Sequence, residues 1–144
     1  MDTSATSITA ITAGRLNVAA WPDPQIDATG YPPGSPYIDL VWLGILGPSA
    51  TWAWTYLARI VATKSAAVVD LDDFAATLGI ARGGRRMSIT HTLDRLVRFG
   101  AARRVDNILA VRRRLPAVPD HQLHRLSATA RTAHQRVTAR QAEA

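Results

Sequence analysis

The chain has 144 residues, a formal net charge of +6 and 47% hydrophobic residues, which is enough apolar material for one domain with a core. It contains no cysteine, and this excludes disulfides, thiolate catalysis and cysteine-ligated zinc. The first residues lack the basic-then-apolar layout of a signal peptide, so we expect a cytoplasmic, nucleoid-associated protein without a membrane span.

The first 36 residues predict a flexible or extended arm that is rich in proline. Residues 1–20 are mostly small and polar, with at most one weak helical turn near 10–20. Residues 21–36 hold five of the eight prolines, which argues against a regular helix there. We expect Trp21 and Tyr31 to hold this arm against the body.

The 19 residues 40–58 carry no charge, and this length would just permit a membrane helix. Gly47 and Pro48 interrupt the stretch, and a proline would break a helix in the middle of the membrane. We therefore favour a short strand or helical turn over 37–46, followed by a buried helix over 48–63 that begins at Pro48.

Two shorter helices are predicted next. Val68 and Val69 indicate a short strand, and Asp70 is the expected N-cap of a helix that ends at Gly79. A third helix is predicted over 88–99. Its apolar stripe is Ile89, Leu93, Leu96 and Val97, and its expected solvent face is Thr90, His91, Asp94, Arg95 and Arg98.

The pattern then changes from helical to strand-like. Residues 101–105 and 108–112 predict a hairpin joined by Asp106 and Asn107, two residues that tolerate positive φ. A last helix is predicted over 120–143, with an apolar stripe spaced by three and four residues. This stripe either packs on the chain's own core or forms a homodimer, and we lean towards partial use in dimerisation; its members are Leu123, Leu126, Ala130, Ala133 and Val137.

Basic residues are concentrated in one part of the chain. Ten of the seventeen lie between Arg82 and Arg114, where the acids are only Asp94 and Asp106. A cationic patch on a helix followed by a hairpin is typical of proteins that contact a phosphate backbone.

The order of helix, short strand, helix, loop, helix and hairpin over 48–115 resembles a winged helix-turn-helix DNA-binding domain. The segments that carry the resemblance are PSATWAWTYLARI, VDLDDFAATLGI, SITHTLDRLVRFG and RRVDNILAVRRR. The whole chain is also similar to small winged-helix proteins of high-GC actinobacteria and their phages, through SPYIDLVWLGILGPSATW, GGRRMS, RLVRFGAARR and LAVRRRLP.

This resemblance implies a mainly α fold with a small β-hairpin, that is, an α+β class. The arm would span 1–36, the winged helix domain 37–116, and the C-terminal helix 117–144.

The resemblance also implies how double-stranded DNA would be bound. In winged helix families the third helix enters the major groove and the wing touches a neighbouring phosphate or the minor groove. Arg95 would pair with guanine, Arg85 and Arg86 would strengthen a phosphate site at the start of the helix, and Arg104 and Arg112 are favoured on the wing. The full expected contact set is Arg82, Arg85, Arg86, Ser88, Thr90, His91, Arg95, Arg98, Arg104 and Arg112.

We therefore expect a bacterial or phage transcriptional regulator and not an enzyme. No catalytic motif, cofactor or metal site is indicated, and His121, His124 and His134 lack a further ligand. The alternative is a winged-helix adaptor that binds a protein through Trp42, Trp52, Trp54 and the last helix. Exposed tryptophans would favour the adaptor, and buried ones would favour DNA binding.

Overall fold

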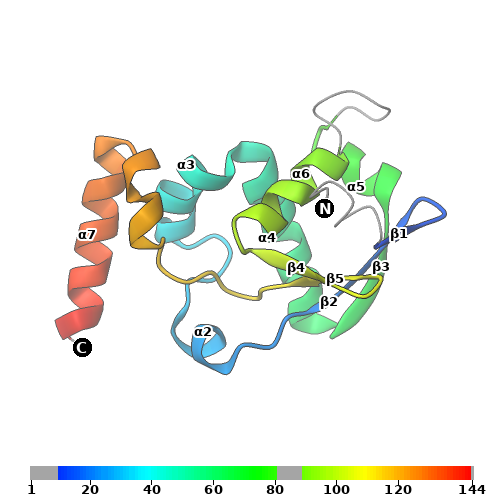
Figure 1. The fold of residues 1–144 in the computed structure, drawn as a ribbon, viewed down its shortest axis with the longest axis horizontal. Coiled ribbons are helices and arrows are strands. Elements are labelled where there is room, and N and C mark those ends of the chain that lie inside the picture. Colours follow the sequence, from blue (N-terminus) through cyan, green and yellow to red (C-terminus); the bar gives the residue numbers. More distant parts are fainter. Residues whose placement is uncertain (1–9, 81–88, 144) are drawn as a thin grey trace.

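A computed structural model describes residues 10–80 and 89–143 of the protein, which has a mixed α+β fold (Figure 1). The described strands form one five-stranded sheet and are β1 (Ile11–Thr12), β2 (Arg15–Ala20), β3 (Ala66–Asp70), β4 (Ala102–Val105) and β5 (Ile108–Val111). The main helical segments are α2 (Pro24–Thr29), the π-helix η1 (Ile38–Trp42), α3 (Leu43–Leu46), α4 (Pro48–Thr63), α5 (Leu71–Thr77), α6 (Ile89–Arg98), the 3-10 helix η2 (Asp120–Arg125) and α7 (Ala128–Glu143).

Strand β2 lies in the middle of the sheet. Val18 and Ala19 pair with β3 in an antiparallel register and with β5 in a parallel one, so these two strands lie on opposite edges of β2. Leu16 and Val18 are buried in the core. The prediction of an extended arm is therefore wrong for residues 15–20. Leu16 and Val18 alternate as in a strand, but the two alanines that follow make this pattern short and weak.

The proline-rich segment after β2 contains a helix, which corrects a second expectation. Helix α2 begins at Pro24, whose missing N–H costs nothing in a first turn. The Asp23 carboxylate caps this helix by accepting a hydrogen bond from the Ile26 N–H at 3.4 Å. Beyond α2, Tyr31 stacks on Tyr37 with ring centroids 4.1 Å apart, so this part of the chain is fixed to the body as predicted.

The uncharged stretch 40–58 contains the end of η1, all of α3 and most of α4. Gly47, at a φ of +86°, separates α3 from α4, and Pro48 is the first residue of α4. The predicted helix over 48–63 is confirmed, and residues 37–46 take the helical alternative. Among the described residues, no helix is both long enough and apolar enough to cross a membrane.

The predictions of α5 and of the hairpin from local sequence patterns are also confirmed. The Asp70 carboxylate accepts a hydrogen bond from the Asp73 N–H at 2.9 Å at the start of α5. Strands β4 and β5 form the predicted hairpin, and Asp106 at its turn has a φ of +56°. Helix α6 packs on α4 through the buried Leu93 and Leu96.

The C-terminal segment is not the single helix that the sequence predicts. The 3-10 helix η2 ends before Leu126, and α7 begins after Ser127, whose hydroxyl accepts a hydrogen bond from the Ala130 N–H at 3.1 Å. A serine in this capping role starts a new helix and so breaks the stripe in two. The stripe residues pack on the chain's own core, with α7 against η1.

The buried side chain of Tyr37 forms hydrogen bonds with two segments of the C-terminal part of the chain. The Tyr37 side chain is 2% exposed, and its hydroxyl accepts a hydrogen bond from the Val118 N–H at 2.8 Å. The same hydroxyl lies 2.7 Å from Nδ1 of the buried His134 on α7. The direction of this second hydrogen bond is set by the tautomer of the His134 ring. Burial raises the pKa of Tyr37 to about 12.

Replacing Tyr37 with phenylalanine tests this connection. We expect Tyr37→Phe to lower the free energy of unfolding at pH 8 by about 1–3 kcal/mol, because it leaves two buried polar groups without a partner. The folded chain keeps the phenol proton that the unfolded chain releases near pH 10, so the wild type loses stability as the pH rises from 10 towards 12. Urea unfolding should show the gap between wild type and variant shrinking by about 1–2 kcal/mol between pH 8 and pH 11.5. A constant gap would contradict the assignment.

Candidate nucleic-acid interface

Six of the ten expected contact residues lie in the described part of the chain. Thr90, His91, Arg95 and Arg98 lie on α6, and Arg104 and Arg112 lie on or next to the hairpin. The other four, Arg82, Arg85, Arg86 and Ser88, lie outside the described residues. On α6, Thr90 is half-buried and His91 is exposed.

The Arg95 guanidinium binds the protein's own backbone. Its Nε donates to the carbonyl of Leu46 at 2.7 Å, and a terminal nitrogen donates to the carbonyl of Ile45 at 2.8 Å. These carbonyls lie in the last turn of α3, where no intrahelical N–H is left to bind them and where a positive charge is favourable. The expectation that Arg95 faces solvent is therefore wrong: the side chain is half-buried and ties α6 to α3, which argues against a contact with guanine.

Arg112 is likewise engaged inside the molecule. Its guanidinium donates to Asp23 at 2.9 Å and to the carbonyl of Gly100 at 2.9 Å, and it lies 3.7 Å from the ring centre of Trp21. Its side chain is only 15% exposed, which argues against the predicted wing contact to phosphate for this residue. The Arg112 hydrogen bond and the Ile26 N–H hold the pKa of Asp23 below its usual range.

The neighbours of Arg112 follow the same pattern. Arg113 forms an ion pair with Asp27 at 3.4 Å, and Arg114 donates to the carbonyl of Gly30 at 3.3 Å. Arg103, although exposed, lies over Trp21 at 4.4 Å. Residues 21–30 thus contact four of the five arginines in or next to the hairpin, namely Arg103, Arg112, Arg113 and Arg114.

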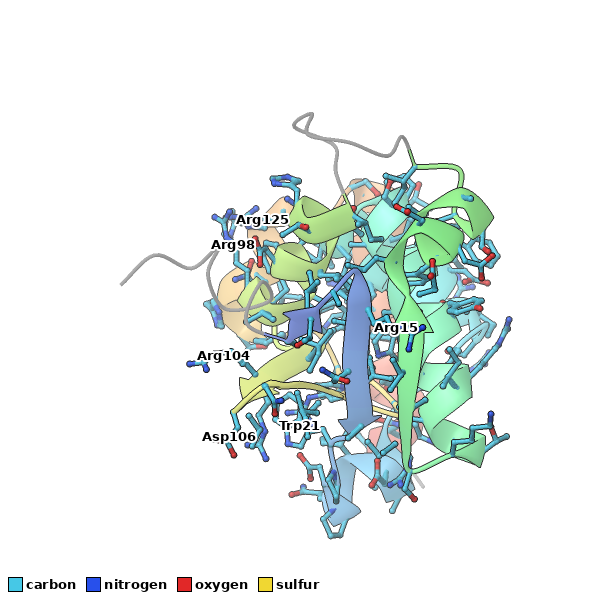
Figure 2. The ribbon with its side chains drawn as sticks, turned by 90° about the vertical axis from the view of Figure 1, so that its right-hand side faces the viewer. Arg15, Trp21, Arg98, Arg104, Asp106 and Arg125 are labelled. Atoms are coloured by element: carbon cyan, nitrogen blue, oxygen red, sulfur yellow. The ribbon has the colours of Figure 1, made fainter. Side chains whose placement is uncertain are left out.

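Three guanidiniums remain exposed along one side of the molecule: Arg98 at the end of α6, Arg125 at the end of η2, and Arg104 on β4 (Figure 2). No carboxylate of the described residues lies within ion-pair range of any of them. Arg104 makes a hydrogen bond to the carbonyl of Asp106 at 3.2 Å. We call these three residues the cationic face.

Arg98 and Arg125 meet over the same aromatic ring. Their guanidinium carbons lie 5.4 and 5.5 Å from the centre of Phe99, and that of Arg95 lies at 5.2 Å. The ring face attracts each cation, but three like charges around one ring repel one another. An anion bound near these guanidiniums would reduce that repulsion and accept charge-assisted hydrogen bonds.

Arg125 was not among the expected contact residues. It lies in the segment that the sequence predicts as part of one long helix, 27 positions after Arg98. Helix η2 packs on α3, to which Arg95 ties α6, and the Arg125 guanidinium lies over the Phe99 ring that follows α6. No spacing in the sequence announces this neighbourhood, because it arises from packing between distant segments.

Comparisons of the chain with models of protein families, with curated proteins and with solved structures gave no match.

The different roles of Arg95 and Arg98 can be tested by comparing the free energy of unfolding of a variant at each position. We expect Arg95→Gln to lower the free energy of unfolding by about 1–3 kcal/mol, because two buried carbonyls lose charged donors. Arg98→Gln, on the same helix but exposed, should change it by less than about 0.5 kcal/mol. Chemical denaturation of both variants checks this. Equal effects would show that Arg95 does not tie α6 to α3.

Because of the Asp23–Arg112 ion pair, we expect the stability of the fold to depend on pH in the acid range. A carboxyl whose pKa is lowered by folding stabilises the fold above about pH 4, its unfolded pKa, and this stabilisation is lost as the pH falls through the folded pKa. We expect Asp23→Asn to be less stable than wild type at pH 7, with the difference in urea midpoint narrowing at pH 3. A difference that stays the same at both pH values would refute the ion pair's role.

Proposed function

We propose that the chain binds double-stranded DNA as a winged-helix regulator, and that the cationic face supplies its contacts to the phosphate backbone. Two features of the molecule support this: the order of its helices and strands, and the positive charge left exposed after folding.

The order α4, β3, α5, α6, β4 and β5 supports the winged-helix assignment. In that arrangement α6 is the recognition helix and the β4–β5 hairpin is the wing. One feature differs from the expected pattern: β2, from the N-terminal segment, lies between β3 and β5. The wing is therefore joined to the rest of the sheet through β2.

The observation that carries the proposal is the cationic face itself. Arg98, Arg104 and Arg125 come from three different elements and yet lie along one side of the molecule (Figure 2). The charge of an exposed arginine without an acidic partner is not offset by the protein, so it is available to an anionic ligand. The planar guanidinium can donate two hydrogen bonds to a pair of phosphate oxygens. Several such groups spaced over one surface suit a repeating anion, which is what a nucleic-acid backbone presents.

The hydrogen bonds of Arg95 favour contacts to phosphate over contacts to bases. Since Arg95 is bound to backbone carbonyls, it is removed from the set that would read guanine. We propose that affinity comes mainly from phosphate contacts and that it falls steeply with salt. Thr90 and His91, on the same helix, remain the candidates for contact with base edges.

The tryptophans weaken the adaptor alternative. Trp42 and Trp54 are buried, and their indole N–H groups donate to the carbonyls of Pro116 and Arg112 at 2.8 and 2.9 Å. Only Trp52 of the three is exposed, at 62%. Two of the three side chains that the adaptor hypothesis needs are therefore part of the core, which favours DNA binding.

Neutralising the cationic face tests the proposal. We expect Arg98→Gln/Arg104→Gln/Arg125→Gln to bind a fluorescent random duplex at least ~10-fold more weakly at low salt, because about three phosphate contacts are lost. The slope of log affinity against log salt should become shallower by up to about 3, at roughly 0.9 for each phosphate contact. Fluorescence anisotropy at several salt concentrations measures both.

A control with the same charge distinguishes a site from general attraction. Arg15→Gln/Arg136→Gln/Arg140→Gln removes three exposed arginines from β2 and α7. It should keep most of the affinity. Wild type that does not bind duplex at low salt, or two triple variants that lose affinity equally, would reject the proposal.

A further inference from the structure

A hollow lies along the outer side of α4, against the end of α5. It has a volume of about 680 Å3 and is lined by Trp52, Tyr56, Arg59 and Ile60 of α4, and by Thr77 and Leu78 beyond them. That volume falls within the usual ~300–1,000 Å3 of small-molecule sites. Figure 2 places α4 and α5 on the right and the labelled arginines of the cationic face on the left, so the hollow is separate from the proposed DNA surface.

The polar donors of the lining are mostly engaged by the protein. The hydroxyl of Thr55 donates to the Thr51 carbonyl at 2.9 Å, that of Thr63 to Ile60 at 3.1 Å, and that of Thr77 to Asp73 at 2.8 Å. Threonines in helices commonly direct their hydroxyls back to the preceding turn in this way. The lining therefore offers methyl groups, aliphatic side chains and aromatic rings, with few polar groups.

Among the described residues that line the hollow, Arg59 is the only basic one. It is exposed, and no carboxylate of the described chain lies within ion-pair range of it. Asp39 lines a smaller adjoining hollow with Arg59 but forms no such pair. The turn at Gly34 lies against the guanidinium, since a Cβ built there would be 3.5 Å from a terminal nitrogen of Arg59. Arg59 therefore places an exposed positive charge at the edge of the hollow.

Two aromatic side chains stand beside that charge. Trp52 and Tyr56 are four residues apart on α4 and so share a helix face. The Tyr56 ring packs on the buried Phe74 at 5.1 Å, which fixes it in place. Trp52 is the most exposed of the large apolar side chains in the described chain, at 62%. An exposed indole on the wall of a hollow is available to stack on a planar ligand.

We infer that this hollow binds a small aromatic carboxylate. The aromatic part would lie against Trp52 and Tyr56, and the carboxylate would accept hydrogen bonds from Arg59. The apolar lining excludes a highly charged ligand, and the single cation suits a single anionic group. The bidentate match between guanidinium and carboxylate provides the selectivity for an acid over a neutral molecule of the same shape.

A pair of matched probes tests the inference: 2-naphthoate and its neutral analogue 2-naphthamide. We expect wild type to bind the carboxylate about tenfold more tightly than the amide, as one charge-assisted pair at an open site would give. Arg59→Gln should abolish this preference while still binding the amide. Trp52→Ala should weaken both ligands by a similar factor. Isothermal titration calorimetry on the full chain gives the affinities.

The controls keep the result interpretable. Arg136→Gln removes an exposed arginine from α7 and should leave both affinities unchanged. Circular dichroism and thermal unfolding check that Arg59→Gln and Trp52→Ala are folded, and glutamine is a good helix former at such a position. Arg59→Lys, which keeps the charge but not the planar pair of donors, should retain part of the preference.

Three results would overturn the inference. The first is that wild type binds neither probe, and the second is that Arg59→Gln keeps the preference for the acid. The third is that sedimentation equilibrium shows a dimer that Trp52→Ala dissociates, because the hollow would then be covered by a second copy of the chain. All three are independent of DNA binding, since neither the probes nor the variants involve the cationic face.

Discussion

Strand β2 lies between β3 and the β4–β5 hairpin, and this pairing decides where the N-terminal segment can run. Because β2 is parallel to β5, the chain leaves it in the same direction as the second strand of the hairpin. The Trp21 N–H then donates to the Val111 carbonyl at 2.9 Å, and Tyr31 exchanges backbone hydrogen bonds with Leu115 at 2.8 and 3.0 Å. Residues 21–31 are thus held beside 111–115 at both ends.

That path helps to determine which arginines bind within the protein and which stay exposed. Asp23, Asp27 and the Gly30 carbonyl each take one of the three consecutive arginines at 112–114. Further off, the carbonyls at the end of α3 take Arg95. A guanidinium that already donates to carbonyls or carboxylates of the protein has fewer donors left for a ligand, so these arginines differ from the exposed cations of the cationic face. The arginines of this small fold therefore form two groups, one bound within the protein and one exposed.

The sequence predicted the elements whose signals are local. Helix 48–63 has its proline at the first turn, Asp70 caps the next helix, and the hairpin turns at Asp106, where positive φ is tolerated; all three are confirmed. The role of β2 was missed because its partners lie about 50 and 90 positions away and its alternation is weak. The break at Ser127 was missed because the apolar spacing continues across it.

The candidate site was harder to predict than the fold, for a physical reason. A solvent-facing position on a helical wheel says nothing about carbonyl acceptors on another element. Arg95 finds its acceptors 49 and 50 positions away, and Arg112 its carboxylate 89 positions away. Charge clustering correctly predicted a basic segment, but only the packing shows which of its guanidiniums are used by the protein itself. Arg125 joins the cationic face through the same kind of packing.

The division of the arginines into two classes is the central claim, and their side chains can be observed directly. In a titration with duplex DNA, followed through the Nε–Hε resonances of the arginines by nuclear magnetic resonance, the signals of Arg98, Arg104 and Arg125 should shift progressively. Those of Arg95 and Arg112, whose Nε groups are bound to carbonyls of Leu46 and Gly100, should stay in place. Shifts at Arg95 and Arg112 with none at the three exposed arginines would contradict the account.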